Sequence, residues 1–278
     1  MTGRFVYDPA SFKGAEHAGW ERVAPGYASA LGRVTAHAAG PLLDATGAGP
    51  GTRLLELCCG PGYAAGAAAA RGAAAVGIDF AAGMVRAAQA LHPGATFRQE
   101  DAEALTFDAA VFDAAVCAFG IHHVPEPERL LAEAHRVLVP GGRFAFAMWC
   151  GPERNEFFAL VLGAIRRYGR PDPPLPPGPP VFRFSDPAAC AAALLAAGFE
   201  SPIVADLPLA FRPASGEDVL ALTYGAAVRM VMLLEAQTEA ARERIHQAIV
   251  DGAAGYVREG RIEIAMPAVL ASATRPRA

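Results

Sequence analysis

The feature that most constrains the fold of this chain is an alternation of strand-like and helix-like segments between residues 52 and 148. Short apolar runs of strand length are separated by longer runs in which apolar residues recur at helical spacing. This alternation favours a parallel sheet with helices on both of its faces. We predict strands at 52–57, 74–78, 95–99, 111–118 and 143–149, and helices at 63–71, 81–91 and 126–138.

The segments outside this region are less regular. Residues 171–181 hold seven prolines, so we expect an extended linker there rather than a helix or strand. A strand interrupted by Pro208 suits a sheet edge, because proline cannot donate a backbone hydrogen bond. We predict further helices within 1–39, at 155–168, from Asp186, from Ser215 and around 245–256, and further strands at 203–211 and 267–273.

Charge and composition argue against several classes of protein. The net charge is −4 and no long basic run occurs, which argues against a nucleic-acid partner. No apolar run is long enough to cross a bilayer, and the first residues lack a signal-peptide core. The five cysteines form no C-x-x-C pair, so we expect neither a metal site nor a disulfide framework. These observations predict a cytoplasmic protein with no membrane partner.

The segment that follows the first predicted strand has the composition of a ligand-binding loop. Its sequence, Cys-Cys-Gly-Pro-Gly at 58–62, leads directly into a predicted helix. Small residues allow the backbone to approach a ligand, and a helix start offers free N–H groups. The loop lacks the G-x-G-x-x-G pattern of a nicotinamide dehydrogenase and the Gly-Lys-Ser/Thr ending of a P-loop.

Acidic residues stand at the ends of the first three predicted strands. They are Glu56, Asp79 and Asp101. Because the carboxyl ends of parallel strands meet at one sheet edge, all three are expected to face one crevice. Asp79 has two interpretations, as the acceptor for the two hydroxyls of a ribose or as a cap for the helix beginning near Ala81. We favour the ribose interpretation, because the neighbouring motifs agree with it.

Five short motifs follow one another in order between residues 50 and 150. They are Glu-x-Cys-x-Gly-x-Gly at 56–62, Val-Gly-Ile-Asp at 76–79, Glu-Asp-Ala-Glu at 100–103, Phe-Asp-Ala-Ala-Val at 112–116 and Leu-Val-Pro-Gly-Gly at 138–142. Together they resemble the motifs of class I S-adenosylmethionine-dependent methyltransferases, and the similarity is greatest to the ubiquinone-biosynthesis-type (methyltransferase-11-like) subgroup. The resemblance implies an α/β fold: a Rossmann-like, doubly wound, mostly parallel seven-stranded sheet with a reversed last strand.

We expect the chain to divide into a cofactor-binding core and an α-helical cap. The cap consists of elements added to the core and is expected to cover the acceptor site. We place the core at 40–150, completed by 183–212 and 262–275, and the cap at 1–39, 152–182 and 213–260.

The cofactor implied by the resemblance is S-adenosylmethionine. Glu56 would orient its ammonium end, Asp79 would bind the ribose hydroxyls and Asp101 would accept from the adenine amino group. At Cys58 the family often has glycine, and we expect cysteine to be small enough to be tolerated. The residues assigned to the cofactor are Glu56, Cys58, Gly60, Gly62, Asp79, Phe80, Met84, Asp101, Ala102, Cys117 and Phe119.

The candidates for catalysis are His122, His123 and Tyr27. Paired histidines beside a methyl donor suggest a general base. The alternative is structural, because a similar histidine pair is common in this subgroup whatever the substrate. Cysteine nucleophiles are not needed, since the sulfonium donor carries its own leaving group.

The predicted function is methyl transfer to carbon, nitrogen or oxygen of a compact, largely apolar or aromatic small molecule, in biosynthesis and in secondary metabolism. The alternatives are a non-catalytic, regulatory S-adenosylmethionine-binding module and a nicotinamide dehydrogenase. The sequence leaves a homodimer open. Arg229 either meets an acceptor carboxylate or is exposed, and about half of the acceptor candidates can simply be cap core. These candidates are Trp20, Trp149, Phe157, Tyr168, Phe182, Tyr224, Arg229 and Met230.

Overall fold

The computed structural model describes residues 7–226 and 228–277. Its centre is a seven-stranded sheet in the order β3-β2-β1-β4-β5-β11-β6. The first five of these strands run parallel, whereas β11 is antiparallel to both β5 and β6. This confirms the predicted fold class, including the reversed last strand. The strands are β1 (Arg53–Leu57), β2 (Ala74–Asp79), β3 (Thr96–Gln99), β4 (Phe112–Ala118), β5 (Leu138–Trp149), β6 (Glu200–Leu207) and β11 (Ala268–Thr274).

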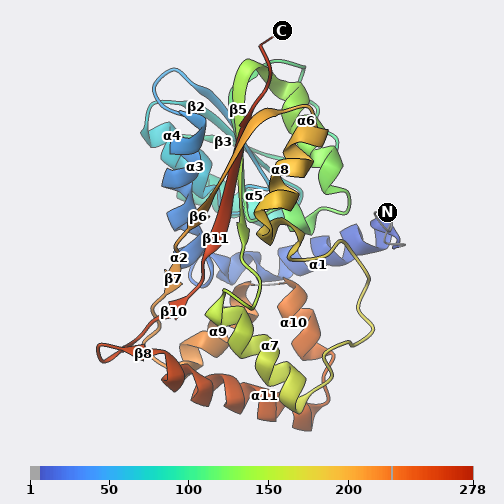
Figure 1. Ribbon diagram of the computed structural model, residues 1–278, viewed down its shortest axis with the longest axis vertical. Coiled ribbons are helices and arrows are strands. Elements are labelled where there is room, and N and C mark those ends of the chain that lie inside the picture. The colour runs from blue at the N-terminus through green and yellow to red at the C-terminus, as the bar shows by residue number, and fades with distance from the viewer. Residues whose placement is uncertain (1–6, 227, 278) are drawn as a thin grey trace.

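Two layers of helices cover the sheet. In Figure 1, α3 and α4 lie on one side of it and α6 and α8 on the other. Strands buried on both faces must be apolar throughout, and Leu54, Leu55 and Leu57 of β1 are accordingly fully buried. The helices of the core are α3 (Ala39–Thr46), α4 (Tyr63–Ala70), α5 (Ala82–Leu91), α6 (Pro127–Val137) and α8 (Pro187–Ala196).

A second group of helices lies beyond one end of the sheet, with α1 passing between the two halves (Figure 1). Helix α11 packs against α7 and α9, and α1 packs against α5, α9 and α10. We keep the division into core and cap as a proposal that this arrangement supports; residues 1–6 and 227 of the cap lie outside the described residues. The helices are α1 (Pro9–Tyr27), α2 (Gly32–Thr35), α7 (Glu156–Tyr168), α9 (Gly216–Ala226), α10 (Val228–Glu235) and α11 (Glu239–Gly252).

Short elements complete the chain. Two small two-stranded sheets, β10 with β7 and β8 with β9, lie outside the main sheet. No helix within 7–226 and 228–277 is both long and apolar enough to span a membrane. The short elements are η1 (Ala36–Ala38), η2 (Ile121–His123), η3 (Arg183–Ser185), η4 (Ala253–Tyr256), β7 (Ala210–Phe211), β8 (Val257–Arg258), β9 (Arg261–Ile262) and β10 (Ile264–Ala265).

Two predicted boundaries differ from the structure. Strand β5 begins at Leu138 rather than Arg143, because Leu138 already pairs with Phe112, and residues 139–142 bulge before pairing resumes between Ala114 and Arg143. The predicted strand at 203–211 is interrupted around Pro208, and its second part joins β10 as a separate ribbon. Its first part, β6, is the edge strand of the main sheet, as the proline indicated.

The stability of the turn into α4 is expected to depend on Gly62. This residue has a φ of +79°, and a Cβ there would lie 2.5 Å from the ring of Phe97. Gly47, at the end of α3, has a similar φ of +69° but no atom within 4 Å of the same position. We expect Gly47→Ala to cost about 1 kcal/mol of backbone strain, and Gly62→Ala about 2 kcal/mol more from overpacking. Urea unfolding measures both, and equal losses would contradict this prediction.

Candidate active site

The loop after β1 turns sharply because three of its residues have a left-handed backbone. Cys58, Gly60 and Gly62 have φ values of +51°, +50° and +79°. A side chain is disfavoured in this region, so the glycine usual at position 58 in the family avoids strain that Cys58 accepts. The choice of residue at position 58 is therefore restricted by the backbone conformation as well as by the size of the side chain. Gly120 makes the room, because a Cβ there would lie 2.3 Å from Cβ of Cys58.

Asp79 holds the loop and the next helix together. Its Oδ2 accepts a hydrogen bond from the Gly60 N–H at 2.8 Å, and its Oδ1 accepts one from the Ala81 N–H at 2.9 Å. Asp79 thus holds the turn that precedes α5, although the N-cap residue of that helix is Ala81. The ribose interpretation stays a prediction, and it is compatible with these bonds because each oxygen keeps a second lone pair for a ligand. Burial raises the pKa of Asp79 to about 6.

Glu56 is buried beneath the start of α4. Its carboxylate accepts hydrogen bonds from the N–H groups of Ala65 at 2.7 Å and Ala64 at 3.3 Å. Burial raises the pKa of Glu56 to about 8, and these two hydrogen bonds only partly oppose that rise. Among the described residues neither Glu56 nor Asp79 forms an ion pair with a side chain. Two buried carboxylates without a cation suit a cofactor that carries an ammonium and a sulfonium group.

These carboxylates line the first of two cavities, which encloses about 860 Å³ counted to its mouth. That size is within the range of small-molecule sites. Two predicted cofactor residues do not line it: Gly62 packs against Phe97, and Cys117 is fully buried beside Cys58 and Gly120. The predicted cofactor residues that do line it are Glu56, Cys58, Gly60, Asp79, Phe80, Met84, Asp101, Ala102 and Phe119.

Asp101 has a partner that the sequence did not reveal. Lys13, the sole lysine of the chain, extends from α1 and pairs with Asp101, and its Nζ donates to Glu103 Oε2 at 2.7 Å. Lys13 also lines the first cavity. An adenine amino group must therefore share Asp101 with this ammonium or displace it. No sequence pattern signalled the pair, because Lys13 and Asp101 are far apart in the chain.

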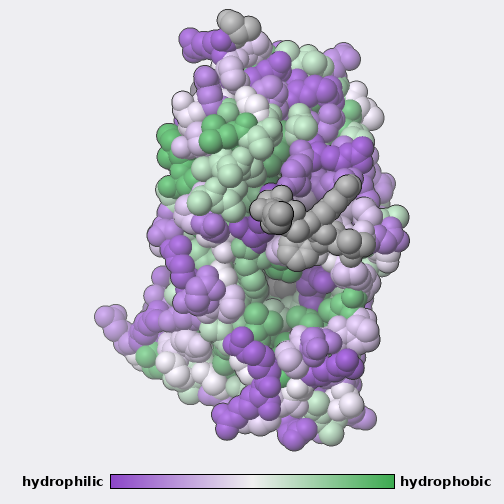
Figure 2. All heavy atoms as spheres, turned by 45° about the vertical axis from the view of Figure 1, so that its right-hand side comes forward, coloured by the Kyte–Doolittle hydropathy of each residue, from purple (hydrophilic) through white to green (hydrophobic). Residues whose placement is uncertain are grey.

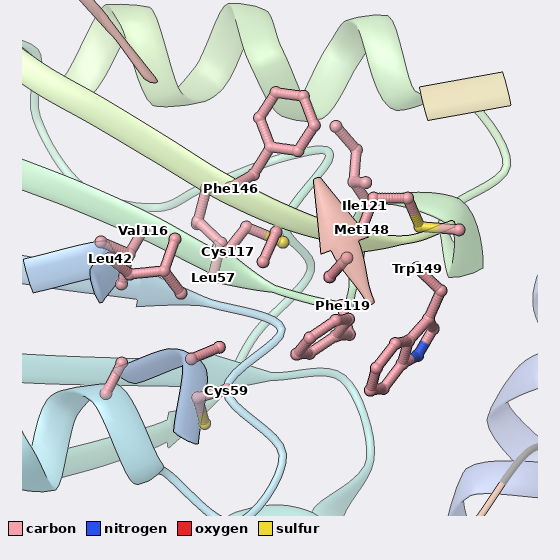
Figure 3. Close-up of a cluster of buried hydrophobic side chains, with 14 of the residues drawn as sticks. Leu42, Leu57, Cys59, Val116, Cys117, Phe119, Ile121, Phe146, Met148 and Trp149 are labelled. Carbon is pink, nitrogen blue, oxygen red and sulfur yellow. The ribbon is translucent and has the colours of Figure 1, made fainter. Parts of the chain in front are cut away.

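The second cavity, of about 810 Å³, lies between the sheet and the helical half of the molecule and is mainly aromatic and apolar. Figure 2 shows hydrophobic side chains gathered around a hollow between these halves. The rings of Phe119 and Trp149 stack in this region, with centroids 4.0 Å apart (Figure 3). The predicted acceptor residues that line the cavity are Trp20, Trp149, Phe157, Phe182, Arg229 and Met230.

Three acceptor candidates differ from expectation. Tyr224 lines neither cavity, and its hydroxyl instead meets His246 Nε2 at 2.8 Å between α9 and α11. Tyr168 also lines neither cavity and lies beneath the guanidinium of Arg167. Arg229 reaches the second cavity, but it donates to the Pro176 carbonyl at 2.8 Å and lies over the ring of Phe12. It is thus held by the proline-rich linker rather than fully exposed.

The two cavities share a wall, where the catalytic candidates separate into different roles. Tyr27 lines both cavities, but burial raises the pKa of its hydroxyl, so it stays protonated. His122 lines only the second cavity, and burial lowers the pKa of its imidazole well below the usual value. His123 lines both cavities, and its Nδ1 lies 2.7 Å from Oε2 of Glu16, a residue that the sequence did not single out. The shared wall consists of Trp20, Tyr27, Phe119 and His123.

Comparison with known proteins decides the family. Residues 55–146, which run from within β1 to within β5, match a family model described as a methyltransferase domain. The chain contains a class I S-adenosylmethionine-dependent methyltransferase domain. The predicted family is thereby confirmed, together with the cofactor that such a domain accommodates. The nicotinamide dehydrogenase alternative has no remaining support.

The match between this methyltransferase domain and its curated relatives covers only part of each chain. The demethylmenaquinone methyltransferase of Renibacterium salmoninarum is 37% identical over 126 residues, which is 45% of this chain and 53% of that protein. The chain thus spans about half the length of the curated relatives it matches.

Solved structures share the fold over a longer span. A putative methyltransferase from Bacillus halodurans is 20% identical, with a TM-score of 0.57 over 86% of this chain and 98% of that one. A protein described as a cyclase is 22% identical, with a TM-score of 0.53 over 87% of this chain and 81% of that one. At these identities the likeness concerns the fold alone.

The buried carboxylates predict how stability depends on pH. The folded-state pKa values of Glu56 and Asp79 are raised. Their contribution to the free energy of unfolding is therefore full below the unfolded-state pKa, and it is lost as pH rises through about 6 for Asp79 and about 8 for Glu56. Between about pH 5.5 and about pH 8.5, the cofactor-free wild type should lose on the order of 2 kcal/mol more unfolding free energy than Glu56→Gln.

Urea unfolding at the two pH values measures this difference, and histidine titrations cancel in the comparison. Glu133→Gln is the matched control. Its hydrogen bonds with Arg136 lower the pKa of the Glu133 carboxyl, so its contribution is lost only at lower pH. Parallel pH slopes in the wild type and Glu56→Gln would contradict the prediction.

Proposed function

We propose that this protein binds S-adenosylmethionine in the first cavity and transfers its methyl group to a small apolar or aromatic molecule in the second. The observation that carries this proposal is the wall that the two cavities share at the end of β4, formed in part by Phe119 and His123. Two sites meeting at one wall suit a reaction in which a group passes from one ligand to the other. A regulatory module that only binds the cofactor has no need of the second cavity.

The residues that would hold the cofactor lie at the ends of β1, β2 and β3. Glu56 and Asp79 place carboxyl groups toward its cations and hydroxyls, and a bound cation would favour their ionised forms against the effect of burial. The loop at 58–62 gives the cofactor's chain close access to the backbone. The bound cofactor supplies an electrophilic methyl group on a positively charged sulfur. The remaining work is alignment and exclusion of water, which can lower a barrier by about 7–11 kcal/mol in well-oriented systems.

The lining of the second cavity supports the proposed class of acceptor. Trp149, Phe157, Phe158 and Phe182 give flat, apolar walls of the kind that bind ring systems. The relatives named demethylmenaquinone methyltransferases support an acceptor of quinone type. A role in secondary metabolism and the assembly state remain predictions from the sequence.

Cofactor binding should depend on Asp79. We expect Asp79→Ala to weaken S-adenosylmethionine binding about tenfold to a hundredfold, because hydrogen bonds to a charged acceptor contribute about 1.5–3 kcal/mol. Calorimetry measures the affinity. Asp113→Ala is the matched control, since Asp113 pairs with Arg53 at the opposite end of β1. Equal affinities in the two variants, both folded by circular dichroism, would refute this site.

Acceptor binding should depend on Phe182 but cofactor binding should not. Phe182 lines only the second cavity, so we expect Phe182→Ala to raise the acceptor KM about tenfold with little change in the affinity for S-adenosylmethionine. Steady-state assays of S-adenosylhomocysteine release, with a reduced naphthoquinone as acceptor, measure the effect. Tyr224→Phe serves as the control outside both cavities. A loss of cofactor affinity in Phe182→Ala would contradict the assignment of Phe182 to the second cavity alone.

A further inference from the structure

The structure joins a buried carboxylate to the histidine on the shared wall. Glu16 lies on α1, and its side chain is fully buried. Its Oε2 is 2.7 Å from Nδ1 of His123, which belongs to η2 after β4. The two residues are 107 positions apart, so only the packing of α1 over the core brings them together. A carboxylate on one imidazole nitrogen fixes the proton there and leaves the lone pair on the other, Nε2.

The position of the imidazole suits contact with a reacting group. His123 lines both cavities, and its side chain is 13% exposed although Nδ1 is already bound. Trp20 packs edge-on against the ring, with centroids 4.7 Å apart, and limits its rotation. The groups that face His123 are Glu16 from α1, His122 from the same turn and Asp79 at the end of β2.

Anchoring α1 does not require this buried charge. Burying a carboxylate is costly unless it is paired, and in the described residues Oε1 of Glu16 has no hydrogen-bond partner. Helix α1 is also attached by Lys13, which pairs with Asp101, and by Glu21, which accepts from the Gly83 N–H at 3.1 Å. A carboxylate placed behind an imidazole is the arrangement that orients a general base and stabilises the imidazolium it becomes.

The charged residues that line the second cavity restrict the chemical class of the acceptor. No aspartate or glutamate is among the residues that line it in the part of the chain described, whereas Arg229 is. An aliphatic amine would enter as a cation and meet no counter-charge there. A neutral aromatic hydroxyl suits the apolar walls, and its proton needs an acceptor when its oxygen is methylated.

We infer that His123 acts as a general base oriented by the Glu16 carboxylate and that the acceptor carries an aromatic hydroxyl. This inference rests on the proposed function. The hydroxyl proton passes to Nε2 of His123 as the oxygen–carbon bond forms. The bond between the methyl carbon and sulfur breaks, and its electron pair stays on sulfur, which leaves as S-adenosylhomocysteine. The imidazolium then returns its proton to solvent. His123 is the catalytic residue and Glu16 its positioning residue.

Binding of a chromogenic phenol tests the pair without turnover. We would add 4-nitrophenol to protein saturated with S-adenosylhomocysteine at about pH 6, where the free phenol is mostly neutral. The wild type should bind it as the yellow phenolate, because His123 takes its proton. His123→Gln and Glu16→Gln should bind it mainly as the neutral phenol. Glu21→Gln, which removes a carboxylate from the same helix away from His123, should keep the phenolate band.

Turnover with a panel of naphthols and catechols gives the second readout. Glu16→Gln should lower kcat about 10²-fold or more and move the acid limb of the pH–rate profile to lower pH, with Glu16→Asp recovering part of the rate. A purely structural role would lower the rate without moving the limb, and Glu21→Gln should leave the limb in place.

The outcomes separate the two levels of the argument. If the wild type binds S-adenosylmethionine but ionises no phenol and methylates no hydroxyl of the panel, the inference is wrong and the methyltransferase function can still stand. The inference also fails if Glu16→Gln keeps both the phenolate band and the limb. If the wild type binds no S-adenosylmethionine, the proposed function fails first and the inference falls with it.

Discussion

The candidate active site depends on one carboxylate that is bonded to two separate stretches of backbone. Asp79 accepts from the N–H of Gly60, in the loop after β1, and from that of Ala81, before α5. These contacts hold the left-handed loop against the end of β2 and leave the remaining lone pairs toward the first cavity. Burial disfavours the ionised form, so the loop is ordered by a charge that the fold itself does not neutralise. A cationic ligand would offset the free-energy cost of the buried carboxylate, so ligand binding is linked to the stability of the loop.

Helix α1 is the second element on which the site relies. It supplies Lys13 to the first cavity, Glu16 to His123 and Glu21 to the start of α5. Trp20 and Tyr27 of the same helix form part of the wall between the cavities. A segment outside the seven-stranded sheet thus completes both sites. Fold alone does not define such a site, since a protein described as a cyclase shares this architecture.

The sequence predicted the core well because its signals are local. Strand patterns, the small-residue loop and acids at strand ends need only neighbouring residues, and they located Glu56, Asp79 and Asp101. The pairs Lys13–Asp101 and Glu16–His123 escaped prediction, because each joins α1 to a distant strand end and no local pattern marks Lys13 or Glu16. Tyr168 and Tyr224 were nominated as aromatic residues of the cap. Helical spacing could not tell which face of each helix meets the cavity and which meets another helix.

The place of β11 in the sheet has a consequence for how the chain is synthesised. This strand lies between β5 and β6 and is hydrogen-bonded to both, yet it follows them in the sequence with α9, α10 and α11 in between. On the ribosome, β6 therefore emerges before the strand to which it must pair and has to wait until the helices between them have been made. During that interval the edge of β5 is open to incorrect pairing, so chaperones that shield sheet edges are expected to act at this stage.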